Sequence, residues 1–179
     1  PGAILLEATF FINVVSSLPD VVLDVKEIEQ KQIVLVSGKS EITLKGKDAE
    51  QYPRIQEISA SNPLTLPIQT LKKIISETAF AASTQESRPI LTGVHFVLSD
   101  HKELKTVATD SHRMSQKNIT LEKNGDNFDV VIPSRSLREL TSVFSDEIEQ
   151  VEVFFANNQI LFRSDNISFY TRLLEGNYP

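Results

Sequence analysis

The chain of 179 residues contains no cysteine, which excludes disulfide frameworks, thiolate chemistry and cysteine-based zinc sites. It also has no Gly-rich phosphate loop, no paired-carboxylate motif and no apolar run near the roughly 20 residues that a membrane span needs. Basic residues are fewer than acidic ones, 18 against 24, so the net charge is −6. Nucleic-acid binding would therefore require a basic surface separated from an acidic remainder. His95 and His101 stand at no recognised ligand spacing, and we expect no metal and no cofactor.

The remaining composition is that of a soluble globular protein, with 40% apolar and 23% charged residues. The apolar opening, Ala3 to Leu18, is no secretory signal, because it lacks a basic start and is interrupted by Glu7 and Asn13. We therefore expect a cytoplasmic location. The chain begins at Pro1 without Met and stops where a strand has just finished, so both ends are expected to be cuts in a longer chain.

A short pattern that occurs three times is the most informative feature of the sequence. The copies span Leu6–Val14, Leu66–Ile74 and Ile132–Leu140, and they begin 60 and 66 residues apart. Each has a branched aliphatic residue, then Pro or Glu, then apolar residues five and eight positions after the start. Repeats at such spacing dictate architecture. The pattern predicts a strand, a short helix and further strands, built by duplication.

Hydrophobic periodicity supplies the elements of each copy. In the first copy, it predicts a helix with the apolar face Phe10, Phe11, Val14, Val15 and Leu18, then strands at Val21–Val25, Gln32–Ser37 and Glu41–Lys45. In the second, it predicts a helix that begins at Pro67 with the stripe Ile68, Leu71, Ile74 and Ile75, then strands at Gly93–Leu98, Leu104–Ala108 and Met114–Leu121 before an Asn124-Gly125 turn. In the third, it predicts a strand at Val130–Ile132, a helix at Pro133–Phe144 and strands at Val151–Phe155, Gln159–Arg163 and Ser168–Leu174.

The segment Tyr52–Pro63 lacks periodicity and carries two prolines, which is typical of a boundary loop. The fold class is therefore α+β, with helices on one face of antiparallel sheets. Residues 1–60 are expected to form half of a domain, and residues 61–179 a complete domain of two units.

The helix faces opposite the apolar stripes carry basic residues in the second and third copies. Lys73 projects opposite the stripe with Lys72 beside it, and Arg135 lies opposite Leu137 with Arg138 beside it. Two interpretations stay open: a solvated helix exterior, or a surface that tracks phosphates without reading bases.

The run Asp110-Ser111-His112 invites a hydrolase hypothesis. A catalytic triad needs Ser bonded to His and His to the carboxylate, whereas neighbours on an extended chain point to opposite faces. No nucleophile-elbow glycines surround Ser111. The residues thus offer nothing specific for an enzyme.

Four segments resemble the bacterial sliding clamp family, the beta subunit of DNA polymerase III, in its Gram-positive form. They are Arg88–Val94 (RPILTGV), Thr106–Met114 (TVATDSHRM), Val131–Arg135 (VIPSR) and Leu174–Pro179 (LEGNYP). The resemblance covers essentially the whole chain, and the Thr-Asp-x-His-Arg block is its specific motif. It implies the DNA clamp (processivity) fold, in which two subunits of three similar domains form a ring around duplex DNA.

The resemblance implies a non-catalytic tether for a DNA-directed DNA polymerase. The residues that would face DNA are Lys72, Lys73, Gln85, Arg88, Arg135 and Arg138. An apolar pocket would accept short Gln- and Leu/Phe-containing peptides from the polymerase III catalytic subunit, the clamp loader, other polymerases and repair proteins. Its residues in this chain would be Leu91, Thr109, Ser111, His112, Arg113, Met114 and Pro179, with Ser111 in place of a common glycine.

The same resemblance implies a homodimer ring that closes between the first domain of one subunit and the third domain of the other. Val14, Leu18 and Lys39 match positions on the first-domain side. It also implies that the opening half of the first domain and the whole third domain are absent here. The rival hypothesis from the residues is a duplicated α+β interaction scaffold without a DNA role, and a hydrolase using Ser111 and His112 stands third.

Overall fold

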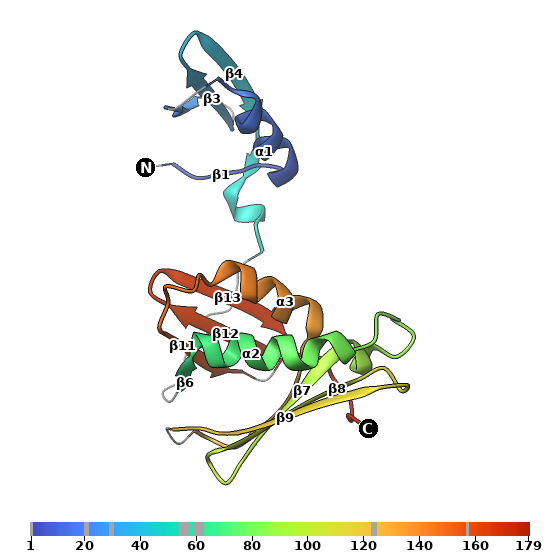
Figure 1. Cartoon of the computed structure of the whole chain (residues 1–179). Coiled ribbons are helices and arrows are strands. Elements are labelled where there is room, and N and C mark those ends of the chain that lie inside the picture. The colour runs from blue at the N-terminus through green and yellow to red at the C-terminus, as the bar shows by residue number, and fades with distance from the viewer. Residues whose placement is uncertain are drawn as a thin grey trace. The chain divides into compact units, whose positions relative to one another are not determined.

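The structure is a computed structural model that describes residues 2–19, 22–28, 31–53, 58, 63–122, 125–156 and 158–179. It divides into two compact units, Pro1–Gln56 and Glu57–Pro179 (Figure 1). Val21, Asn124 and most of the expected linker Tyr52–Pro63 lie outside the described residues. Among the described helices, none is long and apolar enough to cross a membrane.

The order of elements confirms the triplicated strand–helix–three-strand unit. The first copy comprises β1 (Ile4–Leu5), α1 (Ala8–Ser17), β2 (Asp24–Ile28), β3 (Gln32–Ser37) and β4 (Ser40–Lys45). The second comprises β6 (Leu64–Pro67), α2 (Ile68–Thr78), β7 (Gly93–Ser99), β8 (Glu103–Thr109) and β9 (Met114–Thr120). The third comprises β10 (Phe128–Pro133), α3 (Ser134–Val143), β11 (Gln150–Phe155), β12 (Gln159–Ser164) and β13 (Ile167–Arg172).

The second and third copies exchange their first strands. β10 pairs with β7 to give the sheet β10-β7-β8-β9, and β6 pairs with β11 to give the sheet β13-β12-β11-β6, with antiparallel neighbours throughout. Both helices contact the sheets and each other (Figure 1). Residues 57–179 are therefore one interlocked unit rather than two consecutive ones.

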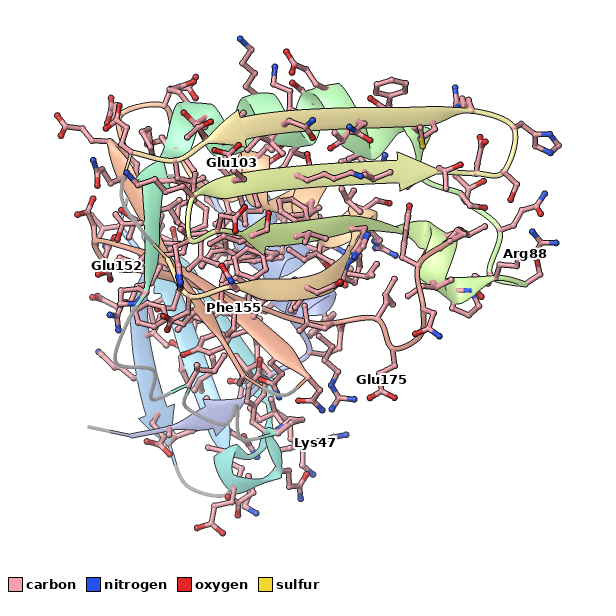
Figure 2. All side chains as sticks on the ribbon, turned by 90° about the horizontal axis from the view of Figure 1, so that it is seen from below. Lys47, Arg88, Glu103, Glu152, Phe155 and Glu175 are labelled. Atoms are coloured by element: carbon pink, nitrogen blue, oxygen red, sulfur yellow. The ribbon has the colours of Figure 1, made fainter. Side chains whose placement is uncertain are left out.

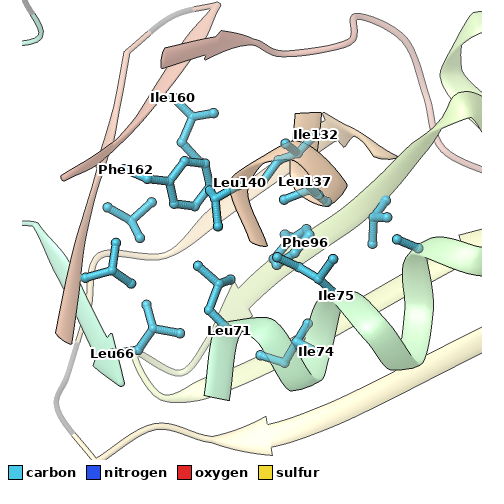
Figure 3. Packing of buried hydrophobic residues seen from close by; sticks show 14 of the residues in the cluster. Leu66, Leu71, Ile74, Ile75, Phe96, Ile132, Leu137, Leu140, Ile160 and Phe162 are labelled. Atoms are coloured by element: carbon cyan, nitrogen blue, oxygen red, sulfur yellow. The ribbon is translucent and has the colours of Figure 1, made fainter. Parts of the chain in front are cut away.

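The core of this second unit is formed by the positions that the repeat marks. Leu71 and Ile74 of α2 are 2% and 1% exposed, and Leu137 and Leu140 of α3 are fully buried. Figure 3 shows them packed with side chains from both sheets, among them Phe162. The predicted α2 stripe is confirmed in full, because Ile68 and Ile75 are buried as well. Burial of such residues supplies most of the driving force for this arrangement.

The first unit is built around a smaller core. Its sheet β2-β3-β4 contributes the buried Ile33, Leu35 and Leu44. Phe11, Val14, Val15 and Leu18 of α1 and its C-terminal cap pack against them and stay partly exposed. Phe10 is 56% exposed, so its assignment to the apolar face was wrong. None of the ten residues of α1 is fully buried.

Several boundaries differ from the prediction. The strand expected at Val21–Val25 is β2, which begins at Asp24 and runs to Ile28, because its register is set by pairing with β3. The helices expected to begin at Pro67 and Pro133 begin one residue later, since both prolines have non-helical backbone angles and still belong to strands β6 and β10. The repeat predicted a first strand in each copy without bounds for β1 and β6. The short strand β5 (Lys47–Asp48) and the 3₁₀ turns η1 (Ala49–Gln51), η2 (Ala79–Ala81) and η3 (Pro89–Thr92) were not predicted.

Candidate functional site

The basic side chains of α2 and α3 border a groove of about 590 Å³ between the two helices. Lys72 and Lys73 of α2 and Arg138 of α3 line it, together with the buried Ile75 and Ala79. Arg135 lies one turn earlier on α3, and its side chain is 90% exposed. The structure thus brings the helix cations that the sequence singled out into one region of the second unit.

Two of these cations already have acidic partners. Lys72 Nζ lies 2.6 Å from Asp146 Oδ1, which also accepts a hydrogen bond from Gln69. The hydrogen bond from Lys72 lowers the pKa of Asp146, so this carboxyl stays ionised. Arg135 Nε donates to Glu139 Oε1 at 3.0 Å. Solvent-exposed pairs of this kind contribute only about 0.2–1 kcal/mol, so an incoming phosphate can replace either acidic partner.

Arg138 has a different environment from the other three cations. Its two terminal nitrogens donate to the carbonyl oxygen of Ala79 and to Ser134 Oγ, both at 3.0 Å. Arg138 therefore holds η2, at the end of α2, against the start of α3. Its predicted role of facing DNA stays a prediction, and the structure adds this contact between the two helices.

The loop between η2 and η3 holds the other residues expected to face DNA. Gln85 and Arg88 are both exposed. Arg88 Nη1 donates to Ser111 Oγ at 3.3 Å, and Figure 2 shows Arg88 at the same end of the sheet as the tip of the β8–β9 hairpin. Arg88 thus links the expected DNA-facing loop to the expected peptide pocket.

Five of the seven predicted pocket residues lie on the β8–β9 hairpin. The strands end at the pair Thr109 and Met114, and the turn between them is closed by hydrogen bonds. Thr109 Oγ1 donates to the carbonyl oxygen of Arg113 at 2.7 Å and accepts from the backbone N–H of Ser111 at 3.1 Å. His112 and Met114 point to solvent, and Met114 is 66% exposed.

Asp110 holds this turn from inside. Its Oδ1 accepts from the backbone N–H groups of His112 and Arg113, both at 3.0 Å, and its Oδ2 accepts from Arg113 Nε. The backbone N–H of His112 is the main cause of the lowered pKa of Asp110. Arg113 also donates to the carbonyl oxygen of Phe80 and lies 5.9 Å from the centre of its ring, which anchors the turn on η2.

The geometry gives the hydrolase hypothesis no support. The Asp110 carboxylate is bonded to backbone and to Arg113, and Ser111 Oγ accepts from Arg88. The reason given from the sequence was wrong, since residues 110–113 form a turn instead of an extended strand. Among the described residues, no group of three or more His, Asp or Glu could hold a metal ion.

Ser111 has φ = 76°, the left-handed region that favours glycine. We expect the Ser111→Gly variant to be more stable to unfolding than the Ser111→Ala variant by about 1 kcal/mol. Both variants lack the hydroxyl, but only alanine is strained in the left-handed conformation. Urea denaturation of the two variants measures the difference. The same pair at Ser115, on strand β9, should show the opposite order, and equal stabilities at Ser111 would contradict the strain.

The last two predicted pocket residues lie apart from the hairpin in sequence. Leu91 in η3 is only 5% exposed, so its side chain packs beneath the surface of the proposed pocket and little of it is open to a peptide. Pro179 is exposed, and its neighbour Tyr178 accepts a hydrogen bond from the backbone N–H of Thr109 at 3.0 Å. Sequence reasoning did not single out Tyr178, although it stands in the LEGNYP block. The predicted ring residues Val14 and Leu18 are half-buried in the first unit, and Lys39 is exposed in the β3–β4 turn.

Comparison with known proteins identifies the chain. Residues 65–179 match the family described as DNA polymerase III beta subunit, central domain, and residues 1–56 match its N-terminal domain. The chain belongs to this family.

The relatives agree with the family in sequence and in structure. The beta sliding clamp of Streptococcus pneumoniae is 84% identical over 99% of this chain. The crystal structure of the beta subunit from DNA polymerase of Streptococcus pyogenes is 72% identical in sequence and matches with a TM-score of 0.96. The match covers all of the present chain and 48% of the Streptococcus pyogenes chain. The crystal structure of the DNA polymerase sliding clamp from Bacillus subtilis is 39% identical in sequence and matches with a TM-score of 0.93. The match covers all of the present chain and 47% of the Bacillus subtilis chain. The chain thus spans about half the length of the relatives it matches: 47% of the Streptococcus pneumoniae protein.

Proposed function

We propose that the protein containing this chain is a sliding clamp that encircles duplex DNA, tethers the replicative polymerase and has no catalytic activity of its own. The observation that carries the proposal is the groove of α2 and α3 on an acidic chain. Lys72, Lys73 and Arg138 line it, and the exposed Arg135 lies one turn before Arg138 on α3. The relatives from Streptococcus pneumoniae and Bacillus subtilis, both named as sliding clamps, support the same function.

The ion pairs on these helices suit a protein that slides. A clamp needs enough positive charge to keep DNA centred, but each tight phosphate contact would impede movement. Lys72 and Arg135 are each balanced by a carboxylate within 3.0 Å, which limits their attraction for phosphate without removing it. Retention then depends on encirclement and not on affinity.

The domain assignment is part of the proposal: residues 1–60 as the second half of the N-terminal domain and residues 61–179 as the central domain. The two units support it. In the second unit, the outer edges of β7 and β11 are each paired by a strand of the other copy. The corresponding strand β2 pairs only with β3 among the described residues, and its Val25 and Ile28 are exposed. Such an edge suits a further strand from the other half of that domain.

The β8–β9 hairpin and Pro179 are proposed as half of the pocket for peptides of the polymerase III catalytic subunit, the clamp loader, other polymerases and repair proteins. The exposed Met114 supports this assignment, because a flexible thioether adapts to varied partners. The homodimer ring, with Val14, Leu18 and Lys39 at its closure, and the cytoplasmic location belong to the same proposal.

Topological retention tests the function. We expect the full-length protein, loaded by its clamp loader onto a nicked circular duplex, to stay bound during gel filtration. Cutting the circle with a restriction enzyme should release it, because a ring slides off a free end. Equal retention on circular and linear DNA would mean ordinary affinity binding, and no retention on either would favour the interaction scaffold.

A further inference from the structure

The segment that leads to Pro179 crosses the sheet β10-β7-β8-β9 and is fastened there at several points. The backbone N–H of Leu174 donates to the carbonyl oxygen of Val131 at 2.9 Å, as an isolated bridge to β10. Gly176 has φ = 131°, a conformation that residues with a side chain rarely adopt, and it lies against Ile90 of η3. The path of the segment is therefore set before Tyr178 is reached.

Tyr178 makes the last attachment. Its ring stacks on the His95 imidazole of β7, with 4.8 Å between centroids and 27° between planes. His95 Nε2 lies 2.6 Å from Asp129 Oδ1 of β10, which fixes the ring on which the tyrosine rests. Burial raises the pKa of Tyr178, so the phenol keeps its proton at neutral pH.

The phenol oxygen of Tyr178 accepts a hydrogen bond from the backbone N–H of Thr109, which has no partner in β7. The β7–β8 ladder runs from Ser99 opposite Glu103 to His95 opposite Val107, and it stops there. Thr109, two residues further, has no partner in β7, and its N–H donates to Tyr178 Oη at 3.0 Å instead. A partly buried N–H without an acceptor is unfavourable, so this bond holds the base of the hairpin turn.

We propose that Tyr178 is a positioning residue of the peptide pocket, whose hydroxyl fixes the β8–β9 hairpin relative to Pro179. The inference rests on the proposed pocket. Thr109 is the residue that orders the turn, because its side chain bonds to both Ser111 and Arg113. Tyr178 thereby connects the two parts of the half-pocket, which lie 69 residues apart in sequence. A pocket fixed before binding loses less conformational freedom when a peptide docks.

Tyr178→Phe in the full-length protein removes the hydroxyl and keeps the stacked ring. We expect its Kd for a fluorescein-labelled peptide containing Gln and Leu-Phe to rise about fivefold to tenfold, mostly through faster dissociation. Amide hydrogen exchange at Thr109 should accelerate, because its N–H loses its acceptor. Tm should fall by no more than a few degrees, and the fraction of already loaded protein that stays on circular DNA should not change. Tyr170→Phe is the matched control, because Tyr170 is a half-buried tyrosine of β13 with no hydrogen bond from its hydroxyl to a described residue.

Each outcome separates the two levels of the proposal. If the unsubstituted protein does not bind the peptide up to about 1 mM, the pocket itself is wrong. If it binds and Tyr178→Phe binds equally well, the pocket stands and the positioning role is refuted. A fall in Tm of about 10 °C or more, or release of already loaded protein from circular DNA, would make Tyr178 a general structural residue and also refute the role.

Discussion

Replacing Lys72, Lys73 and Arg135 together by glutamate is expected to abolish loading of the full-length protein onto circular DNA at physiological salt and to shorten primer extension. Each phosphate contact contributes about −0.9 to the slope of log affinity against log salt concentration, so three contacts contribute about −2.7. Such a slope corresponds to about a 40-fold change in affinity between about 50 and about 200 mM salt. Reversal of the charge adds repulsion to the loss of attraction. The measurements are loading yield and primer-extension length as functions of salt.

Arg138 is left out of this variant because its guanidinium joins α3 to η2, so its removal would mix unfolding with loss of charge. The control carries the same charge change at Lys102, Lys105 and Arg172, which are exposed on the β7–β8 turn and on strands of the two sheets. Equal loss in both variants would indicate a general effect of net charge. Normal loading of the Lys72, Lys73 and Arg135 variant would mean that the helix face does not meet DNA.

The sequence predicted those parts of the fold that depend on local periodicity. The helix stripe through Leu71 and the one through Leu137 are buried as expected. A 3.6-residue period places these apolar side chains on one face of the helix, and that face packs against the sheets. The exchange of β6 and β10 between the two sheets could not be predicted, since pairing between strands far apart in sequence leaves no periodic trace. The same limit explains Phe10: helical spacing permits its burial, but tertiary packing decides it, and Phe10 is 56% exposed in the described first unit.

The candidate site follows the same division. Helical geometry predicted that Lys73 and Arg135 would be exposed, and both are. It could not indicate that Arg138 bonds to Ala79 or that Asp146 approaches Lys72, because these contacts depend on how two distant helices pack. The resemblance supplied the hairpin residues as a set, yet only the structure connects them through Thr109 to Tyr178.

The second large effect concerns the repeated positions in the core. We expect Leu71→Ala and Leu137→Ala each to lower the free energy of unfolding of the second unit by about 2–5 kcal/mol, because a fully buried leucine leaves both lost transfer energy and a cavity. Leu71 is 2% exposed and Leu137 fully buried, both within the cluster that joins the two sheets. Urea denaturation followed by circular dichroism measures the change.

Val143→Ala on α3 is the matched control, since its side chain is 44% exposed and should change stability by less than about 0.5 kcal/mol. Val14, the first-unit counterpart of Ile74 and Leu140 in the repeat, is half-buried, so Val14→Ala should give a smaller loss than Leu137→Ala. Because β6 and β10 cross between the sheets, Leu71→Ala and Leu137→Ala should weaken both sheets in one transition. Separate transitions for the two sheets, or a loss at Leu137 no larger than at Val143, would show that the exchanged strands do not make one cooperative core.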